Sequence, residues 1–274
     1  MRKTAFADSF YPGGSDELLR FIEGAMASAE VSPKPVESAV AYVSPHAGYA
    51  YSGKTAAYTY KAMQCMKDID SIESVVIVGP NHTGVGAPIA VSTDDWETPI
   101  GVAKNDTALS NAIASTHDVY VDEDAHRDEH SIEVQLPFLK HALPGKRFCF
   151  VCLGDQSIEA SELLAGAILN ASRSLGRKVI VLASSDFDHY EPAEIAEGKD
   201  SRLLEALKHM DHATFNRLVE ELGDSICGFG PITTAMMFAK EMGAGSGVVL
   251  KYSNSGDATG DYSSVVAYAS LAFV

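Results

Sequence analysis

Short apolar runs alternate with longer segments of helical periodicity along most of the chain. The Val- and Ile-rich runs carry no polar face and are too short for helices, which is typical of strands buried on both sides. We predict strands at residues 39–44, 74–79, 89–93, 147–153, 178–183, 246–253 and 263–273. The 3.6-residue pattern predicts helices at residues 51–66, 106–115, 131–142, 158–175, 193–209, 213–222 and 231–242, with Asn105 as N-cap of the second and Pro137 starting or kinking the third.

This alternation predicts an α/β fold with a mainly parallel or mixed central sheet covered by helices on both faces. The chain shows no Pro/Ser-rich linker, internal repeat or low-complexity tract. We therefore expect one domain spanning residues 1–274.

Three of the predicted strands run into segments that carry a histidine. These segments are Pro45-His46-Ala47-Gly48, Pro80-Asn81-His82 and Ser184-Ser185-Asp186-Phe187-Asp188-His189. In open α/β sheets, ligands bind outside the carboxyl ends of the strands. Because the chain holds only 9 His in 274 residues, their recurrence at three strand ends predicts a functional site.

The residue types in these segments favour a metal ion. Neutral imidazole suits iron, zinc, copper and nickel, and two His with one carboxylate is the arrangement of non-haem Fe(II) sites. We predict a divalent ion, with iron preferred and zinc or copper as alternatives. Tyr49 and Phe187 are expected to line a pocket for a small substrate.

Two further segments compete with or extend this site. The run from His126 to His130 matches His-x-x-Glu-His, the inverzincin metallopeptidase pattern, which requires both histidines on one helix. The preceding residues read as a loop, so the alternative is that His130 alone points into the same cleft from a helix start. The polar loop at residues 253–262 is either a β-turn connection or the source of a carboxylate, from Asp257 or Asp261, that closes the metal site.

Composition narrows the classes of partner. The chain has 21 Lys and Arg against 37 Asp and Glu, a net charge of −16. This shortage of Lys and Arg argues against binding to nucleic acid or to an anionic membrane. Neither a signal peptide nor an apolar run of membrane-spanning length is visible, so we expect a cytoplasmic location. Cys149 and Cys152 lie in a predicted buried strand and are expected to be inert core thiols.

The motif segments together resemble the Memo family, also called AmmeMemoRadiSam system protein B. The resemblance rests on Ala7-Asp8-Ser9-Phe10-Tyr11-Pro12, Pro45-His46-Ala47-Gly48-Tyr49 with Ser52-Gly53, Gly79-Pro80-Asn81-His82, Glu129-His130-Ser131-Ile132-Glu133, Ser184-Ser185-Asp186-Phe187 with His189, and Asp261 with Ser263-Ser264-Val265. These segments span nearly the whole chain in order. The resemblance implies a fold like that of the class III non-haem iron extradiol dioxygenases.

The resemblance also assigns residues. It places His46 and His82 on the family's metal-binding histidines, and Asp186 and His189 on its other pocket residues, with His189 as acid/base by analogy with the dioxygenases. Animal members supply a Cys from a late loop as third ligand. Here no Cys follows Cys227, and the corresponding loop offers Asp257, which we expect to be the third ligand; the alternatives are weak metal binding or Asp186 as the ligand.

Three functions follow as hypotheses. The first is a metal-dependent, dioxygenase-like protein in which His46, His82 and Asp257 hold the ion, and His189, Asp186 and His130 act on a small substrate. The second is a non-catalytic module that holds a peptide or protein partner in the same cleft. The third is the metallopeptidase. The family association also implies a radical SAM protein and an AMMECR-type protein as separate partner chains.

Overall fold

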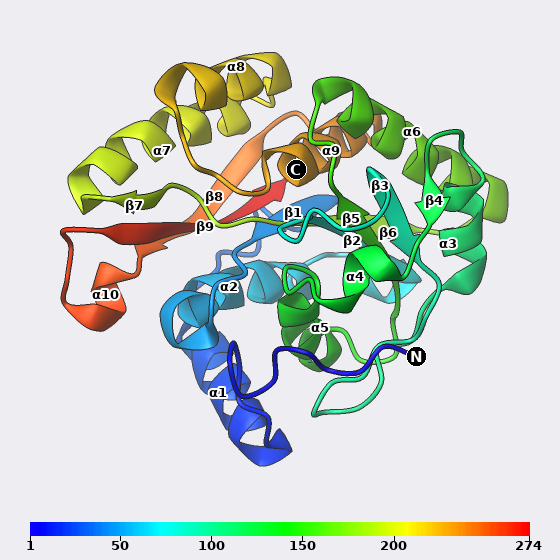
Figure 1. The fold of residues 1–274 in the computed structure, drawn as a ribbon, viewed down its shortest axis with the longest axis horizontal. Helices are drawn as coiled ribbons and strands as arrows, with labels where there is room; N and C mark the ends of the chain where they lie inside the picture. The colour runs from blue at the N-terminus through cyan, green and yellow to red at the C-terminus, as the bar shows by residue number, and fades with distance from the viewer.

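A nine-stranded mixed sheet runs through the computed structural model, which describes residues 1–274 (Figure 1). Its strand order is β4-β3-β5-β2-β6-β1-β9-β7, and β8 pairs with β9. The strands are β1 (Ala41–Ser44), β2 (Ser74–Pro80), β3 (Ile89–Ser92), β4 (Tyr120–Val121), β5 (Arg147–Leu153), β6 (Val179–Ser184), β7 (His189–Glu191), β8 (Gly247–Asn254) and β9 (Val265–Phe273).

Helices cover both faces of this sheet, as Figure 1 shows. One face is covered by α3 (Thr107–Ala114), α6 (Ile158–Leu175), α7 (Ala193–Lys208), α8 (His212–Leu222) and α9 (Phe229–Glu241). The other is covered by α1 (Ser15–Ser28), α2 (Tyr49–Gln64) and α5 (Leu136–Ala142). Short helical segments complete the chain at η1 (Ile69–Ser71), α4 (Asp124–Arg127), η2 (Glu133–Gln135) and α10 (Gly256–Thr259).

Strand β2 shows why the strand sequences are apolar throughout. Val76 and Val78 belong to the core under α6 and α9, whereas Val75 and Ile77 belong to the core under α2 and α5. Successive side chains of a strand point to opposite faces, so a strand covered on both sides needs an apolar residue at every position. The α/β architecture with a mixed sheet and two helical layers is therefore confirmed.

The differences from the predicted elements are local. Asp106, not Asn105, caps α3, because its carboxylate accepts a hydrogen bond from Leu109 N at 3.3 Å. Pro137 lies in the first turn of α5, where a missing N–H costs no helical hydrogen bond. Helix α1 was not predicted. No helix in the structure has both the length and the apolarity that crossing a bilayer requires.

The topology brings the three histidine-bearing strand ends together. Strand β6 pairs in parallel with β2 on one side and with β1 on the other. The carboxyl ends of these three strands therefore lie side by side at one edge of the sheet.

Candidate metal centre

Three histidine rings meet at this edge. The ring centroids of His46 and His82 are 5.2 Å apart, and His130 lies 5.1 Å from His46 and 4.5 Å from His82. His46 follows β1 and His82 follows β2, as predicted, whereas His130 enters from the loop between α4 and η2. The structure thus brings together three of the residues expected in the site.

Hydrogen bonds around His46 determine which of its ring nitrogens faces the cluster. The hydroxyl of Ser184 donates its only proton to Ser131 O at 2.6 Å and accepts from Gln135 Nε2 at 2.7 Å. His46 Nδ1, 2.9 Å from the same oxygen, must therefore donate to it. The lone pair of the ring is left on Nε2, which is the state that a metal ligand needs.

Burial keeps this ring neutral. His46 is 1% exposed, and burial, followed by the positive charges that His130, His82 and His189 would carry, holds its pKa well below the usual histidine value. A neutral imidazole is the form that binds a cation.

Glu129 orients His82 in the same way. Its carboxylate accepts from His82 N at 2.6 Å, from His82 Nδ1 at 2.9 Å and from Ser131 N at 2.9 Å. Burial opposes its ionisation, but the hydrogen bond and charge of His82 and the Ser131 N–H outweigh burial and lower the pKa of Glu129 to about 2. An ionised carboxylate can only accept, so Nδ1 of His82 carries a proton, and in the neutral ring Nε2 carries the lone pair.

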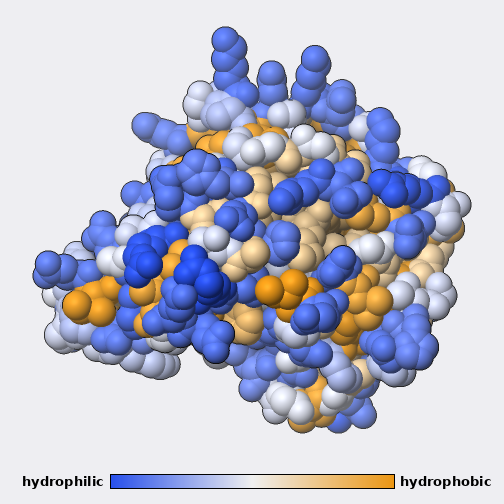
Figure 2. Space-filling model, turned by 90° about the horizontal axis from the view of Figure 1, so that it is seen from above, coloured by the Kyte–Doolittle hydropathy of each residue, from blue (hydrophilic) through white to orange (hydrophobic).

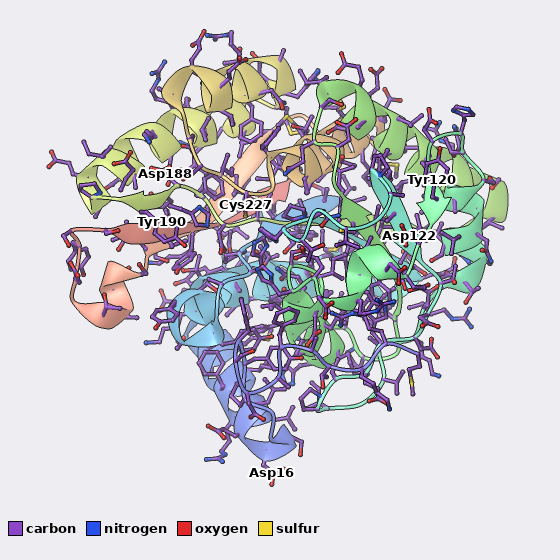
Figure 3. All side chains as sticks on the ribbon, viewed as in Figure 1. Asp16, Tyr120, Asp122, Asp188, Tyr190 and Cys227 are labelled. Carbon is purple, nitrogen blue, oxygen red and sulfur yellow. The ribbon has the colours of Figure 1, made fainter.

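Cys227 supplies the third donor atom beside these two rings. Its Sγ lies 3.2 Å from His46 Nε2, and the candidate ligand atoms of His46, His82 and Cys227 all lie within 4.8 Å of one another. Figure 3 labels Cys227 near the centre of the molecule. The residue precedes Gly228, the N-cap of α9, and burial raises the pKa of its thiol.

Asp257, the expected third ligand, is not part of this group. It lies on the exposed α10, where its carboxylate accepts from Tyr262 Oη at 3.3 Å. Asp261 is also exposed and accepts from Ser263 N and Oγ. The helix–turn geometry of residues 255–263 satisfies these carboxylates locally, so the structure offers Cys227 in the place given to Asp257.

Asp186 and His189 follow β6 and border the cluster. Asp186 Oδ1 accepts from His46 N at 2.8 Å and Ala47 N at 3.2 Å, so this carboxyl holds the loop that carries His46. Burial raises the pKa of Asp186 to about 7 despite these bonds. His189 is half-buried, its Nδ1 has no hydrogen-bond partner, and burial lowers its pKa.

The N-terminal segment completes the wall behind His130. Phe10 and Phe6 pack against the His130 ring at centroid distances of 4.7 and 5.6 Å. The Arg2 guanidinium donates to the carbonyl oxygens of His126 and Glu129 at 2.7 and 2.9 Å and pairs with the buried Glu133. Arg2 thereby ties down the loop that carries Glu129 and His130.

The His-x-x-Glu-His pattern does not form a peptidase motif. Helix α4 ends at Arg127, and His126 is fully buried against Trp96, at a centroid distance of 5.5 Å. Its two histidines therefore do not share a helix, and Glu129 binds His82 instead.

Burial also decides the roles that the sequence predicted for two aromatic residues and two cysteines. Tyr49 donates to Val134 O at 2.8 Å inside the core, and Phe187 is fully buried, so the expectation that they line a pocket is wrong. Cys149 and Cys152 are free, fully buried thiols of β5, and burial raises the pKa of both.

Sequence reasoning missed Cys227 and Glu129. Neither follows a strand, so the strand-end rule could not find them. The available signal for Cys227 was its position directly before a Gly and an apolar helix. The glycine is required because a side chain on Gly228 would collide with Ser184 O, so this turn packs against the end of β6. An acid next to a histidine was the signal for Glu129.

Comparisons with known proteins agree with this architecture. The family model described as Memo-like protein matches residues 2–272. A MEMO1 family protein of Archaeoglobus fulgidus is 43% identical, covering 100% of this chain and 99% of that protein, and one of Methanopyrus kandleri is 39% identical, covering 99% and 98%. The crystal structure of an uncharacterized protein of Escherichia coli K12 has a TM-score of 0.54 at 13% identity, covering 85% of this chain and 99% of that one, which shows a shared fold.

Proposed function

The chain belongs to the Memo-like protein family, and on this basis we propose that it is a metal-dependent, dioxygenase-like protein that acts on a small substrate. The proposal rests on one observation: the candidate donor atoms of two imidazoles and a thiol all lie within 4.8 Å of one another. Both Nε2 atoms are left facing the cluster because Ser184 and Glu129 hold the opposite ring nitrogens, and Nε2 of His46 contacts Cys227 Sγ at 3.2 Å. Such hydrogen bonds to the second ring nitrogen are the usual support of a histidine ligand.

The donor set bears on the kind of ion. A carboxylate in the third position was the ground for preferring iron, whereas a thiolate is a softer ligand that also suits zinc and copper. We therefore propose iron, zinc or copper, held by His46, His82 and Cys227. When bound, such an ion would supply Lewis-acid or redox chemistry to a small molecule at its open positions.

The remaining residues would support that chemistry in separate roles. His189 is placed to move a proton, since it borders the cluster and its Nδ1 is unpartnered. Asp186 would hold the His46 loop, and its raised pKa allows it to exist in either protonation state near neutral pH. His130 would pack beside His82 and exclude water from one side of the ion.

Metal analysis of protein purified under anaerobic conditions tests the proposal. We expect about one transition-metal ion per wild-type chain, none in His46→Ala/His82→Ala, a reduced content in Cys227→Ser and an unchanged content in Asp257→Asn. A double-histidine variant that retains the wild-type content would refute the site. Loss of metal in Asp257→Asn with retention in Cys227→Ser would restore the carboxylate ligand.

The family association keeps a second function in view, a binding module that uses the same cleft for a peptide. The radical SAM and AMMECR-type proteins are proposed partners on the same ground. The cluster itself offers no Arg for a phosphate, because Arg2 is engaged with Glu133 and backbone carbonyls. Isothermal calorimetry with a phosphopeptide, using wild type and the double-histidine variant, separates the two functions.

A further inference from the structure

Several large apolar side chains are exposed around β7 and α10, beside the metal centre. Tyr190 is 79% exposed, Tyr262 50%, Ile195 49% and Tyr51 49%. Figure 3 shows Tyr190 on the segment beside β9, and Figure 1 places α10 next to the same strand. On the face of the molecule drawn in Figure 2, hydrophilic side chains lie between the hydrophobic areas and separate them.

Backbone pairing places the segments that carry Tyr190, Ile195 and Tyr262 next to one another. Ala193 N, at the start of α7, donates to Tyr262 O at 3.0 Å, so Tyr262 lies against the helix turn that carries Ile195. Strand β7, which carries Tyr190, pairs with the start of β9 directly after Tyr262. We call the surface formed by Tyr190, Ile195 and Tyr262 the tyrosine patch.

The backbone of Tyr190 adds a second observation. Its φ is +64°, a left-handed conformation that costs a non-glycine residue free energy, and the β7–β9 register shifts between His189 and Glu191. Its side chain gains no burial in return. Strained residues of this kind cluster at active sites, ligand clamps and switch regions.

Charge indicates the chemistry of that partner. Residues 188–200 and 253–264 contain seven acids, and their one base, Lys199, pairs with Asp188 and Glu191. Glu194 and Glu197 are exposed on α7, which carries Ile195, and Asp257 is exposed on α10; none of the three pairs with a basic side chain. Tyrosine faces with nearby carboxylates favour guanidinium and ammonium groups through cation–π and ionic contacts.

We propose that the tyrosine patch is a docking surface for an arginine-rich segment of another protein. The segment would lie over β7 and α10, with its guanidinium groups on Tyr190 and Tyr262 and between Glu194 and Glu197. Tyr190 follows His189, with ring centroids 5.8 Å apart, so the docked segment would cover one side of the entrance to the metal centre. The surface uses none of the metal-binding residues.

Fluorescence anisotropy with labelled nona-arginine tests the patch, with nona-glutamate as counter-probe. Tyr190→Gly removes the side chain and relieves the left-handed strain, so it is expected to raise the melting temperature while weakening binding at least fivefold. Glu194→Gln/Glu197→Gln is expected to weaken binding by a similar factor. The control Glu220→Gln/Glu241→Gln removes the same charge from exposed positions on α8 and α9 and should stay within twofold of wild type.

The outcomes separate specific docking from general attraction to an acidic protein. Equal weakening in the control and patch variants would show that net charge alone binds the peptide and would overturn the proposal. Unchanged binding in Tyr190→Gly, or binding of nona-glutamate, would also overturn it. The His46→Ala/His82→Ala variant should bind nona-arginine as wild type does, so failure of the metal proposal leaves this test intact.

Discussion

Replacing Glu129 with Gln changes one atom and should weaken His82 as a ligand. The carboxylate accepts from two donors at Oε1 and one at Oε2, and all three are N–H groups. A glutamine must place its NH2 against at least one of them. Either the backbone bond to His82 is lost, or His82 moves its proton to Nε2 and loses the lone pair that faces the cluster.

The size of the effect follows from the role of such partners. Loss of a residue that orients a histidine ligand typically weakens metal affinity 10- to 100-fold, which is about 1.4 to 2.8 kcal/mol. Competition with a chromophoric chelator, under anaerobic conditions and for each candidate ion, measures the affinity. Circular dichroism melting on the same samples checks that the variant is folded.

Glu123→Gln is the matched control. Glu123 also anchors a loop, since its carboxylate accepts from Thr93 N at 2.8 Å and Ser92 Oγ at 2.7 Å, but this carboxylate accepts no hydrogen bond from a histidine. Its metal affinity should equal that of wild type. If Glu129→Gln bound metal as tightly as Glu123→Gln, the assignment of Nε2 of His82 as a ligand atom held by Glu129 would be refuted.

Three further variants test the surroundings of the site. Burial, followed by the charge of Arg2, lowers the pKa of His126 from 6.5 to about 4, so the unfolded chain binds a proton that the folded chain refuses. His126 alone should therefore contribute a loss of about 3 kcal/mol of stability as pH drops from 6.5 to 4, and His126→Leu should lose that much less than wild type in thermal unfolding at the two values. Gly228→Ala would place a Cβ 2.5 Å from a backbone carbonyl and should lower the free energy of unfolding in urea by about 1–3 kcal/mol. Gly198→Ala, in open space on α7, should raise that free energy by about 0.5–1 kcal/mol. Arg2→Ala leaves Glu133 buried without its cation and should cost about 3 kcal/mol, and a cost below 1 kcal/mol in urea unfolding would contradict that role.

The sequence predicted the bounds of an element well where residues within it or next to it determine those bounds. The bounds of β5 and α6 match the expected residues. Strand β5 is apolar from Phe148 to Leu153. Helix α6 has Ser157 as its N-cap, whose side chain accepts from Ala160 N, and the left-handed Gly176 as its C-cap. Helix α1 was missed although Leu18 and Ile22 lie on one helical face, since its N-cap, Gly14, gives no side-chain signal.

The candidate site was predictable only as far as strand order allowed. His46, His82 and Asp186 follow three strands that pair, so one rule found all three. Cys227 comes from a loop before α9, and its approach to His46 depends on how α9 packs against β6, which no local pattern encodes. Asp257 was chosen by position in the chain, and the helical turn of α10 points that part of the chain into solvent.

The pairing of β1 with β9 has a consequence for how the protein reaches its native state. Residues 41–43 align with residues 271–273, so the strand that presents His46 acquires its second neighbour only after almost the whole chain is available. Closing so large a loop lowers the entropy of the chain long before the contact stabilises it, which slows folding. During synthesis on the ribosome, β1 would keep the edge opposite β6 open until β9 emerges, and that open edge would be exposed to aggregation in the meantime.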